Sequence, residues 1–393
     1  MEKDLNEVHI EGETEMDIET SILQQARQFE AQQDSNLLIE LLEESKKYFD
    51  SMANTRIAKI VRTIIDILVQ LPNPTKQREE VVQKWIDWST KENKTFLRFK
   101  LELAGASLNY ELGDYTKMKG VLAKLLKEVK RLDDKRLLVE IHILECQCFL
   151  RLMDLHHARA SLTSARMEAN SVYIPQQAQA RLDLWSGLVC MLERDFSTAY
   201  SYFYESWETF AALNSPKSLF SLKMVCIARL MQSQSEEVLA LLSGKLLLKY
   251  AGQTIHAIRD LAKSLQNQSL HDFQTALSTY PEELTLDPFV EPHLEELRSN
   301  LFEKHLSRII LPYSVVEISH VAFLIGIDEE IVERKLAQMI LDGKLSARLD
   351  QETRCVTIID SEQEHAVFSS SMNIYGSVRK VLDSLTSKAR LVK

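Results

Sequence analysis

Apolar residues recur at helical spacing over much of the chain. In one segment they lie three or four positions apart, or side by side, on a single helical face: Met118, Val121, Leu122, Leu125, Leu126 and Val129. The next segment carries one set at Leu137, Ile141, Leu144 and Cys148 and a second at Ile143, Gln147 and Leu150. Because a helix that is apolar on two sides needs neighbours on both, this pattern predicts an interior helix of a stacked array.

A short signature recurs about every forty residues. An acidic residue is followed by a bulky apolar residue, and a residue suited to helix packing stands four positions after the acid. The copies are Asp114-Tyr115 with Met118, Asp154-Leu155 with Ala158, Asp195-Phe196 with Ala199, Asp272-Phe273 with Ala276, and, earlier, Asp34 with Leu38. They are 80, 40, 41 and 77 residues apart, so degenerate copies are expected near Pro74 and Gln234.

Each Asp of this signature can cap the helix that follows it. A period near forty matches two helices and their turns, and it is typical of helical-repeat solenoids. We therefore predict a mainly α-helical fold with a right-handed, TPR-like solenoid over residues 21–300. Residues 1–20 are acidic and lack apolar periodicity, so we expect them to be disordered.

The pattern changes near residue 313 to a short mixed unit. Ser319 and Asp328 are suited to cap helices, and Gly343 is suited to end one. Strands are predicted at 315–318, 345–349 and 355–359, and helices at 320–325 and 328–341. Strand, helix, helix and hairpin in this order indicate a winged helix within residues 301–360.

Charge argues against nucleic-acid binding by this winged helix. Residues 305–360 hold six basic and nine acidic residues, and the helix that would enter DNA begins Asp328-Glu329-Glu330. The whole chain has a net charge of -10. The small sheet is better suited to pair with a strand of another protein. Its candidate protein-binding residues are Val315, Val316, Ile318, Leu345, Val356 and Ile358.

A further amphipathic helix is predicted within residues 361–393, after a polar linker from Ser361 to Ser371. Its apolar seam recurs at spacings of mostly three and four and supplies a second set of candidate protein-binding residues: Ile374, Val378, Val381, Leu382 and Leu385. The helix either folds back on its own domain or joins an external bundle, and the preceding linker favours the bundle.

Composition supports long helices with short connections. The 393 residues include only 10 Gly and 8 Pro. The beginning Met1-Glu2-Lys3-Asp4 is unlike a signal peptide, and no apolar run reaches the length of a membrane span, so we expect a soluble intracellular protein without a membrane partner. The five scattered cysteines indicate reduced thiols.

No catalytic, cofactor or metal site is indicated. Phosphate-binding loops, nucleophile elbows and His-Glu-x-x-His are absent from the sequence. His156 and His157 are adjacent, so on a helix they point about 100° apart and cannot chelate one ion together. Trp85 and Trp88 are candidates for a peptide-binding site, but packing between repeats is the favoured interpretation.

Several stretches resemble a known family. They are Leu132–Lys135, Ala160–Arg166, Asn170–Tyr173, Ala199–Ser206, Asn267–Phe273, Leu349–Gln351 and, most specific, Val332–Asp342. Together they resemble the PCI-domain subunits of the proteasome regulatory-particle lid, in particular the family of its sixth non-ATPase subunit. The hairpin after Gln351 lacks the glycines usual in that family, and the first thirty residues match poorly.

The resemblance implies a non-catalytic scaffold of the cytoplasm and nucleus, without cofactors. Its implied partners are other PCI lid subunits, the lid deubiquitinase subunits, the ATPase ring and the outer ring of the core particle. The winged helix and the C-terminal helix would join neighbouring lid subunits, while the solenoid would brace the lid to the other two assemblies. The alternatives are the paralogous second subunit of the signalosome and a stand-alone helical-repeat adaptor.

Overall fold

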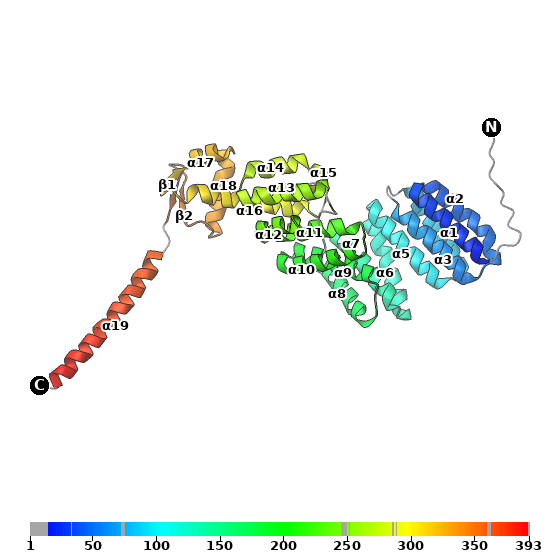
Figure 1. The fold of residues 1–393 in the computed structure, drawn as a ribbon, viewed down its shortest axis with the longest axis horizontal. Coiled ribbons are helices and arrows are strands. Elements are labelled where there is room, and N and C mark those ends of the chain that lie inside the picture. The colour runs from blue at the N-terminus through cyan, green and yellow to red at the C-terminus, as the bar shows by residue number, and fades with distance from the viewer. Residues whose placement is uncertain are drawn as a thin grey trace. The chain divides into compact units, whose positions relative to one another are not determined.

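The computed structural model describes residues 15–32, 34–71, 75–244, 250, 252–284, 287, 289–359 and 363–391. These residues are mostly helical, with a three-stranded sheet near the C-terminal end (Figure 1). The chain forms two compact units, residues 1–228 and 229–393. The predicted fold class, a helical solenoid followed by a winged helix and a C-terminal helix, is confirmed.

The first unit is a succession of helices, and from α1 to α10 each α-helix packs against the next. Its helices are α1 (Glu15–Gln32), α2 (Ser35–Ser45), the 3₁₀ helix η1 (Lys46–Ser51), α3 (Asn54–Gln70), α4 (Lys76–Lys91), α5 (Thr95–Leu112), α6 (Tyr115–Leu132), α7 (Lys135–Arg151), α8 (Leu155–Ser171), α9 (Gln176–Leu192), α10 (Phe196–Ala212) and the beginning of α11 (Lys217–Met231).

Alternate helices of this unit form an inner row. Helix α3 packs on α5, α5 on α7, and α7 on α9, in addition to their sequence neighbours. Helix α7 is accordingly covered on more than one side, and both apolar sets predicted for it are buried. Helix α6 buries one stripe, of Met118, Leu122, Leu125 and Val129. The distinction between one-sided and two-sided helices is therefore confirmed.

Most helix junctions in this array share one turn. A residue with a positive φ ends the first helix: Asn93, Gly113, Asp133, Met153, Arg194, Asn214 and Ser233, with φ between 50° and 84°. At six of these seven junctions the next residue donates its N–H back to a carbonyl five positions earlier, for example Asp154 to Phe149 at 2.9 Å and Asp195 to Cys190 at 3.0 Å; Asp133 is the exception. These bonds satisfy carbonyl groups that a helix end leaves free, as in a Schellman motif. The forty-residue period is thus two helices and two turns; most of these turns have this form, but the one between α8 and α9 does not, since Val172 is extended there.

The repeat signature marks the start of the second helix of each pair. Asp154 and Asp195 accept a hydrogen bond from the backbone N–H three residues later, at 3.4 and 3.2 Å, so both cap their helices as predicted. Asp34 and Asp114 also stand at the N-cap, but their side chains make no capping hydrogen bond, so the prediction is wrong for these two. The position four residues after the acid is buried in every copy: Leu38, Met118, Ala158, Ala199 and Ala276. The degenerate copy is also recognisable, since Gln234 precedes α12 and Val238 is fully buried. Pro74 lies outside the described residues.

The cap of α14 (Leu270–Thr279) differs from the prediction. Ser269, not Asp272, stands at the N-cap, and its hydroxyl accepts the N–H of Asp272 at 3.2 Å. Asp272 lies in the first turn, where a carboxylate interacts favourably with the helix dipole. Serine at this position removes the need for a capping aspartate.

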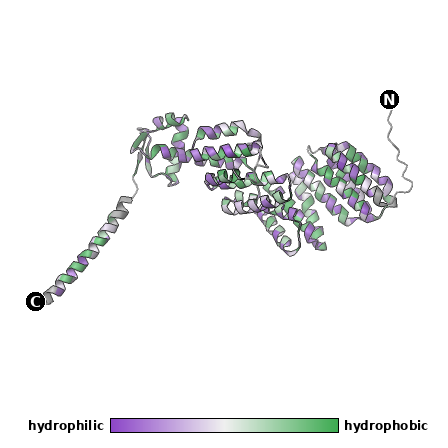
Figure 2. Ribbon diagram, viewed as in Figure 1, coloured by the Kyte–Doolittle hydropathy of each residue, from purple (hydrophilic) through white to green (hydrophobic). Residues whose placement is uncertain are grey.

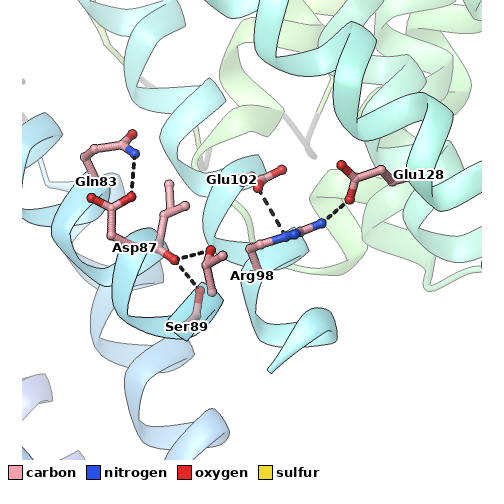
Figure 3. Close-up of polar contacts among 8 residues, drawn as sticks. Gln83, Asp87, Ser89, Arg98, Glu102 and Glu128 are labelled. Carbon is pink, nitrogen blue, oxygen red and sulfur yellow. Dashed lines mark hydrogen bonds and ion pairs between the residues drawn. The ribbon is translucent and has the colours of Figure 1, made fainter. Parts of the chain in front are cut away.

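Polar and aromatic contacts also connect neighbouring helices of the first unit. Arg98 on α5 pairs with Glu102 one turn along and with Glu128 on α6 (Figure 3). Trp85 is buried in the N-terminal core, its ring 5.1 Å from that of Trp88. The packing interpretation of this tryptophan pair is therefore confirmed.

The second unit joins a short helical array to the winged helix. Its elements are α12 (Ser235–Leu242), α13 (Gln253–Asn267), α14, α15 (Pro281–Leu284), α16 (Glu291–Ile310), β1 (Val315–Glu317), α17 (Ile318–Ile325), α18 (Glu329–Leu341), β2 (Ala347–Asp350), β3 (Cys355–Ile358) and α19 (Gln363–Leu391). Both β1 and β2 pair antiparallel with β3, so the strand order is β1-β3-β2. Helices α16, α17 and α18 and the sheet share one core.

The hairpin tip forms without glycine. The carboxylate of Asp350 accepts the N–H of Glu352 at 3.1 Å and the hydroxyl of Thr353 at 2.9 Å, and Arg354 takes the positive φ of 49°. The hydrogen bond from Thr353 lowers the pKa of Asp350, because it favours the ionised carboxylate. An aspartate turn thus forms this tip without glycine.

Three predicted boundaries are corrected. Helix α1 begins at Glu15, within the segment expected to be disordered, because Ile22 and Ala26 pack in the core; residues 1–14 lie outside the described residues. Helix α17 begins at Ile318 rather than after Ser319, since the Ile318 side chain is buried. Helix α19 begins at Gln363, inside the predicted linker. That linker contains no Gly or Pro, so its polarity signals exposure rather than a helix break.

Candidate protein-interaction surfaces

The sheet of the winged helix presents two edges, β1 and β2. The strand β3 is central and pairs on both sides, so Val356 and Ile358 have no free backbone edge to offer a partner strand. Val315, on the edge strand β1, is exposed. Only β1 and β2 are therefore positioned for pairing with another protein.

Four of the six residues predicted for this surface belong to the core. Val316, Ile318, Leu345 and Val356 are each at most 5% exposed and pack in the winged-helix interior. Their side chains therefore stabilise the module instead of reaching a partner. The apolar alternation of a strand identifies its buried face, and this face is turned toward α16, α17 and α18.

The most exposed apolar side chains of the module lie at helix ends. Phe323 on α17 is 84% exposed, and Leu341 on α18 is 86% exposed. Sequence reasoning missed both, although the signal is present: Val332, Leu336 and Met339 define the buried face of α18, and Leu341 does not continue it. These two side chains are candidates for contact with a partner.

Helix α19 carries the second predicted set on its surface. Ile374, Val378, Val381, Leu382 and Leu385 are between 52% and 67% exposed. At about 100° per residue they fall within an arc of about 100°, so they form one stripe. Figure 2 shows hydrophobic and hydrophilic residues alternating along α19. We call this set the α19 stripe.

An ion-pair cluster joins the winged helix to α16. Glu303 lies 2.9 Å from the Lys335 ammonium group and 2.6 Å from that of Lys344. Lys335 also donates to the Ser299 hydroxyl at 2.8 Å. Burial raises the pKa of Glu303, but the hydrogen bonds from Lys344 and Lys335 outweigh it, and the pKa lies below its usual value. The cluster therefore holds α18 and the turn after it against α16.

The histidine and cysteine side chains of the first unit that could carry chemistry have structural roles. His157 pairs with the capping carboxylate of Asp154 at 2.7 Å, which agrees with its interpretation as a polar residue at a repeat turn. Burial raises the pKa of the Cys146 thiol to about 12, so this cysteine is a poor nucleophile. Among the described residues, no group of three His, Cys, Asp or Glu side chains is arranged to hold a metal ion.

Across the described ranges, every helix is too short or too polar to span a bilayer.

Two family models match the chain. One, described as PCI domain, matches residues 270–360, which include the whole winged helix. The other, described as 26S proteasome regulatory subunit RPN6 N-terminal domain, matches residues 3–112.

Curated relatives match nearly the full length. The 26S proteasome non-ATPase regulatory subunit 11 of Dictyostelium discoideum is 39% identical over 388 residues, covering 98% of this chain and 94% of the relative. The probable 26S proteasome regulatory subunit rpn6 of Schizosaccharomyces pombe is 40% identical over 351 residues, covering 89% and 83%. The 26S proteasome regulatory subunit RPN6 of Saccharomyces cerevisiae is 34% identical over 379 residues, covering 95% and 87%.

Proposed function

Because the chain belongs to the family of 26S proteasome non-ATPase regulatory subunit 11, also named RPN6, we propose that it is a non-catalytic structural subunit of the lid of the proteasome regulatory particle. Its role is to hold other subunits in place for ubiquitin-dependent protein degradation. It acts in the cytoplasm and nucleus.

The α19 stripe is the observation that carries this proposal. A helix of a monomer normally buries its apolar face, yet all five stripe residues are exposed. Such a stripe, at spacings of three and four, fits a bundle with helices of other PCI lid subunits and of the lid deubiquitinase subunits. The bundle interpretation is therefore preferred to a helix folded back on its own domain.

The solenoid supplies the second half of the proposal. Its helices occupy most of the chain before the winged helix. We assign them to bracing the lid against the ATPase ring and the outer ring of the core particle. The relatives named above are all proteasome regulatory subunits, which favours the lid over the signalosome or a stand-alone adaptor.

A pull-down with the tagged full-length chain tests the assignment. It should recover lid, ATPase-ring and core-particle subunits. Recovery of signalosome subunits, or of small client proteins alone, would contradict it.

A matched pair of substitutions in α19 tests the stripe. Leu382→Asp places a charge in the stripe, whereas Ser387→Asp places the same charge on the opposite face of the helix. We expect Leu382→Asp, and a chain truncated before Ile374, to remain folded but fail to enter the complex. Ser387→Asp should assemble normally. Normal assembly of both altered chains would exclude the stripe as a docking surface.

A further inference from the structure

Helix α6 carries charge of almost a single sign. It has six basic side chains and one acid, Glu128, which pairs with Arg98 on α5 (Figure 3), on a chain whose net charge is -10. All six basic side chains are exposed, and at about 100° per residue they fall within an arc of about 160°, opposite the buried stripe of α6. We call this set the α6 basic face, and its members are Lys117, Lys119, Lys124, Lys127, Lys130 and Arg131.

Only the first two cations of the α6 basic face have partners in the fold. Lys117 lies 2.8 Å from Asp114 and 3.6 Å from Glu79 on α4. The ammonium group of Lys119 lies 5.1 Å from the centre of the Phe149 ring. The cations that make no hydrogen bond or ion pair, over the ranges that the structure describes, are Lys124, Lys127, Lys130 and Arg131.

These like charges destabilise the helix that carries them. Lys127 lies three positions from Lys124 and four from Arg131, and cations at these spacings repel each other on a helix surface. Arg131, in the last turn, interacts favourably with the helix dipole, but Lys124 and Lys127 lie in the middle of α6 and gain nothing from it. Lys124 interacts with Glu102 only beyond ion-pair distance, and Glu102 is held by Arg98 at 3.4 Å. The fold therefore leaves this concentration of positive charge largely uncompensated.

Small residues lie among the cations of α6. Gly120 and Ala123 are both exposed, and nothing lies within 4 Å of a Cβ atom placed on Gly120. Positions 117, 120, 124, 127 and 131 recur at spacings of three and four, as in the seam along which two helices pack. A second helix can therefore approach α6 closely between its basic side chains.

From this face we propose that α6 binds an acidic α-helix of a partner protein, whose carboxylates, at spacings of three and four, lie opposite Lys124, Lys127 and Arg131. Hydrogen bonds between these cations and the carboxylates replace the repulsion between neighbouring cations. The guanidinium group of Arg131 can bind a carboxylate through two parallel hydrogen bonds. Charge complementarity and the spacing of the cations thus define the partner.

The rest of the exposed surface of α6 argues against other anionic partners. Every residue of α6 is described by the structure, and its exposed positions include no aromatic side chain and one large apolar one, Leu132. Single-stranded nucleic acid is usually held by aromatic rings on which its bases stack. A helix that lies on a lipid surface needs an apolar face to insert. An acidic protein helix needs neither.

Three labelled peptides test the proposal on the isolated full-length chain. All are alanine-rich, helical and fluorescein-labelled: the first has glutamates at spacings of three and four on one face, the second has the same number of glutamates spread around the helix, and the third has glutamine in place of each glutamate of the first. Fluorescence anisotropy should show the tightest binding for the first peptide, and added salt should weaken it. Equal binding of the first two peptides, or no binding of the first, would overturn the proposal. So would tighter binding of an oligothymidylate of the same charge or of phosphatidylserine vesicles.

A matched pair of charge reversals locates the binding site. Lys127→Glu removes one ion pair and adds a repulsion, so it should weaken binding of the first peptide by about fivefold or more. The new carboxylate lies one turn from Arg131, which keeps α6 helical. Lys47→Glu makes the same change at an exposed lysine of η1, outside α6, and should leave binding unchanged.

A second α6 variant keeps the test valid if the charge reversal disturbs folding. Lys124→Gln with Lys127→Gln introduces no new charge, and glutamine is a good helix former. We expect binding about threefold weaker or more, with an unchanged far-ultraviolet circular dichroism spectrum. Wild-type affinity in both α6 variants, or an equal loss in Lys47→Glu, would refute the site.

Discussion

The backbone of Gly187 on α9 and the ring of Phe203 on α10 lie so close that a Cβ atom on Gly187 would be 2.6 Å from Cδ1 and Cε1 of that ring. Phe203 is fully buried, so its ring cannot move out of the way. The close approach of α9 and α10 therefore depends on glycine at this position.

Gly187→Ala should consequently destabilise the first unit, by about 1–3 kcal/mol, the usual cost of overpacking a core. Gly120→Ala is the matched control, because nothing lies within 4 Å of a Cβ at this exposed position of α6. Alanine is the better helix former, so Gly120→Ala should stabilise by about 0.5–1 kcal/mol. Urea unfolding of the two variants should give changes of opposite sign, and a stabilising Gly187→Ala would contradict the observed packing.

The left-handed turn that the helix junctions share predicts opposite changes in stability for a second pair of substitutions. Met153 occupies the left-handed conformation with φ 59°, and its side chain is exposed. Met153→Gly should relieve backbone strain and stabilise the chain by up to about 1 kcal/mol. Gly113→Ala, at φ 84° in the equivalent turn, should destabilise it by about 1 kcal/mol. Thermal unfolding followed by circular dichroism would check both, and destabilisation by Met153→Gly would show that the methionine side chain outweighs the strain.

Glu303 predicts a pH dependence of the winged-helix module. Its pKa is lower in the folded chain than its ordinary value, so it binds fewer protons when folded than when unfolded. The stability that it contributes is present at neutral pH and is lost as the pH falls through the folded pKa. Glu303→Gln should thus cost roughly 1 kcal/mol near neutral pH, and the difference from wild type should disappear in acid.

Chemical denaturation at about pH 7 and about pH 3 measures that difference directly. Glu352→Gln, a change at the exposed hairpin tip, is the control and should show little effect at either pH. A Glu303→Gln penalty that persists unchanged in acid would mean that packing, rather than ionisation, is responsible.

The sequence predicted well those helices whose buried faces follow from the spacing of apolar residues along the chain. The one-sided stripe of α6 and the two-sided pattern of α7 translate directly into burial, because helical period fixes which side chains share a face. The helix junctions were harder to foresee. Gly113 is the familiar sign of a left-handed turn, whereas Met153 and Arg194 take the same conformation without one.

The candidate surfaces were predicted less well. Alternation in the winged-helix strands identifies apolar residues, but it cannot distinguish a buried face from a docking face, and Val356 proved to be core.

The α19 stripe has a consequence for a copy that has not yet found its partners. On a free chain, the same five apolar side chains are in contact with water. Free copies at high concentration are therefore expected to self-associate through α19, and Leu382→Asp should keep them monomeric. The amount of this chain that a cell makes must then match the amount of the partner helices that cover α19, since any excess chain exposes a surface that self-associates.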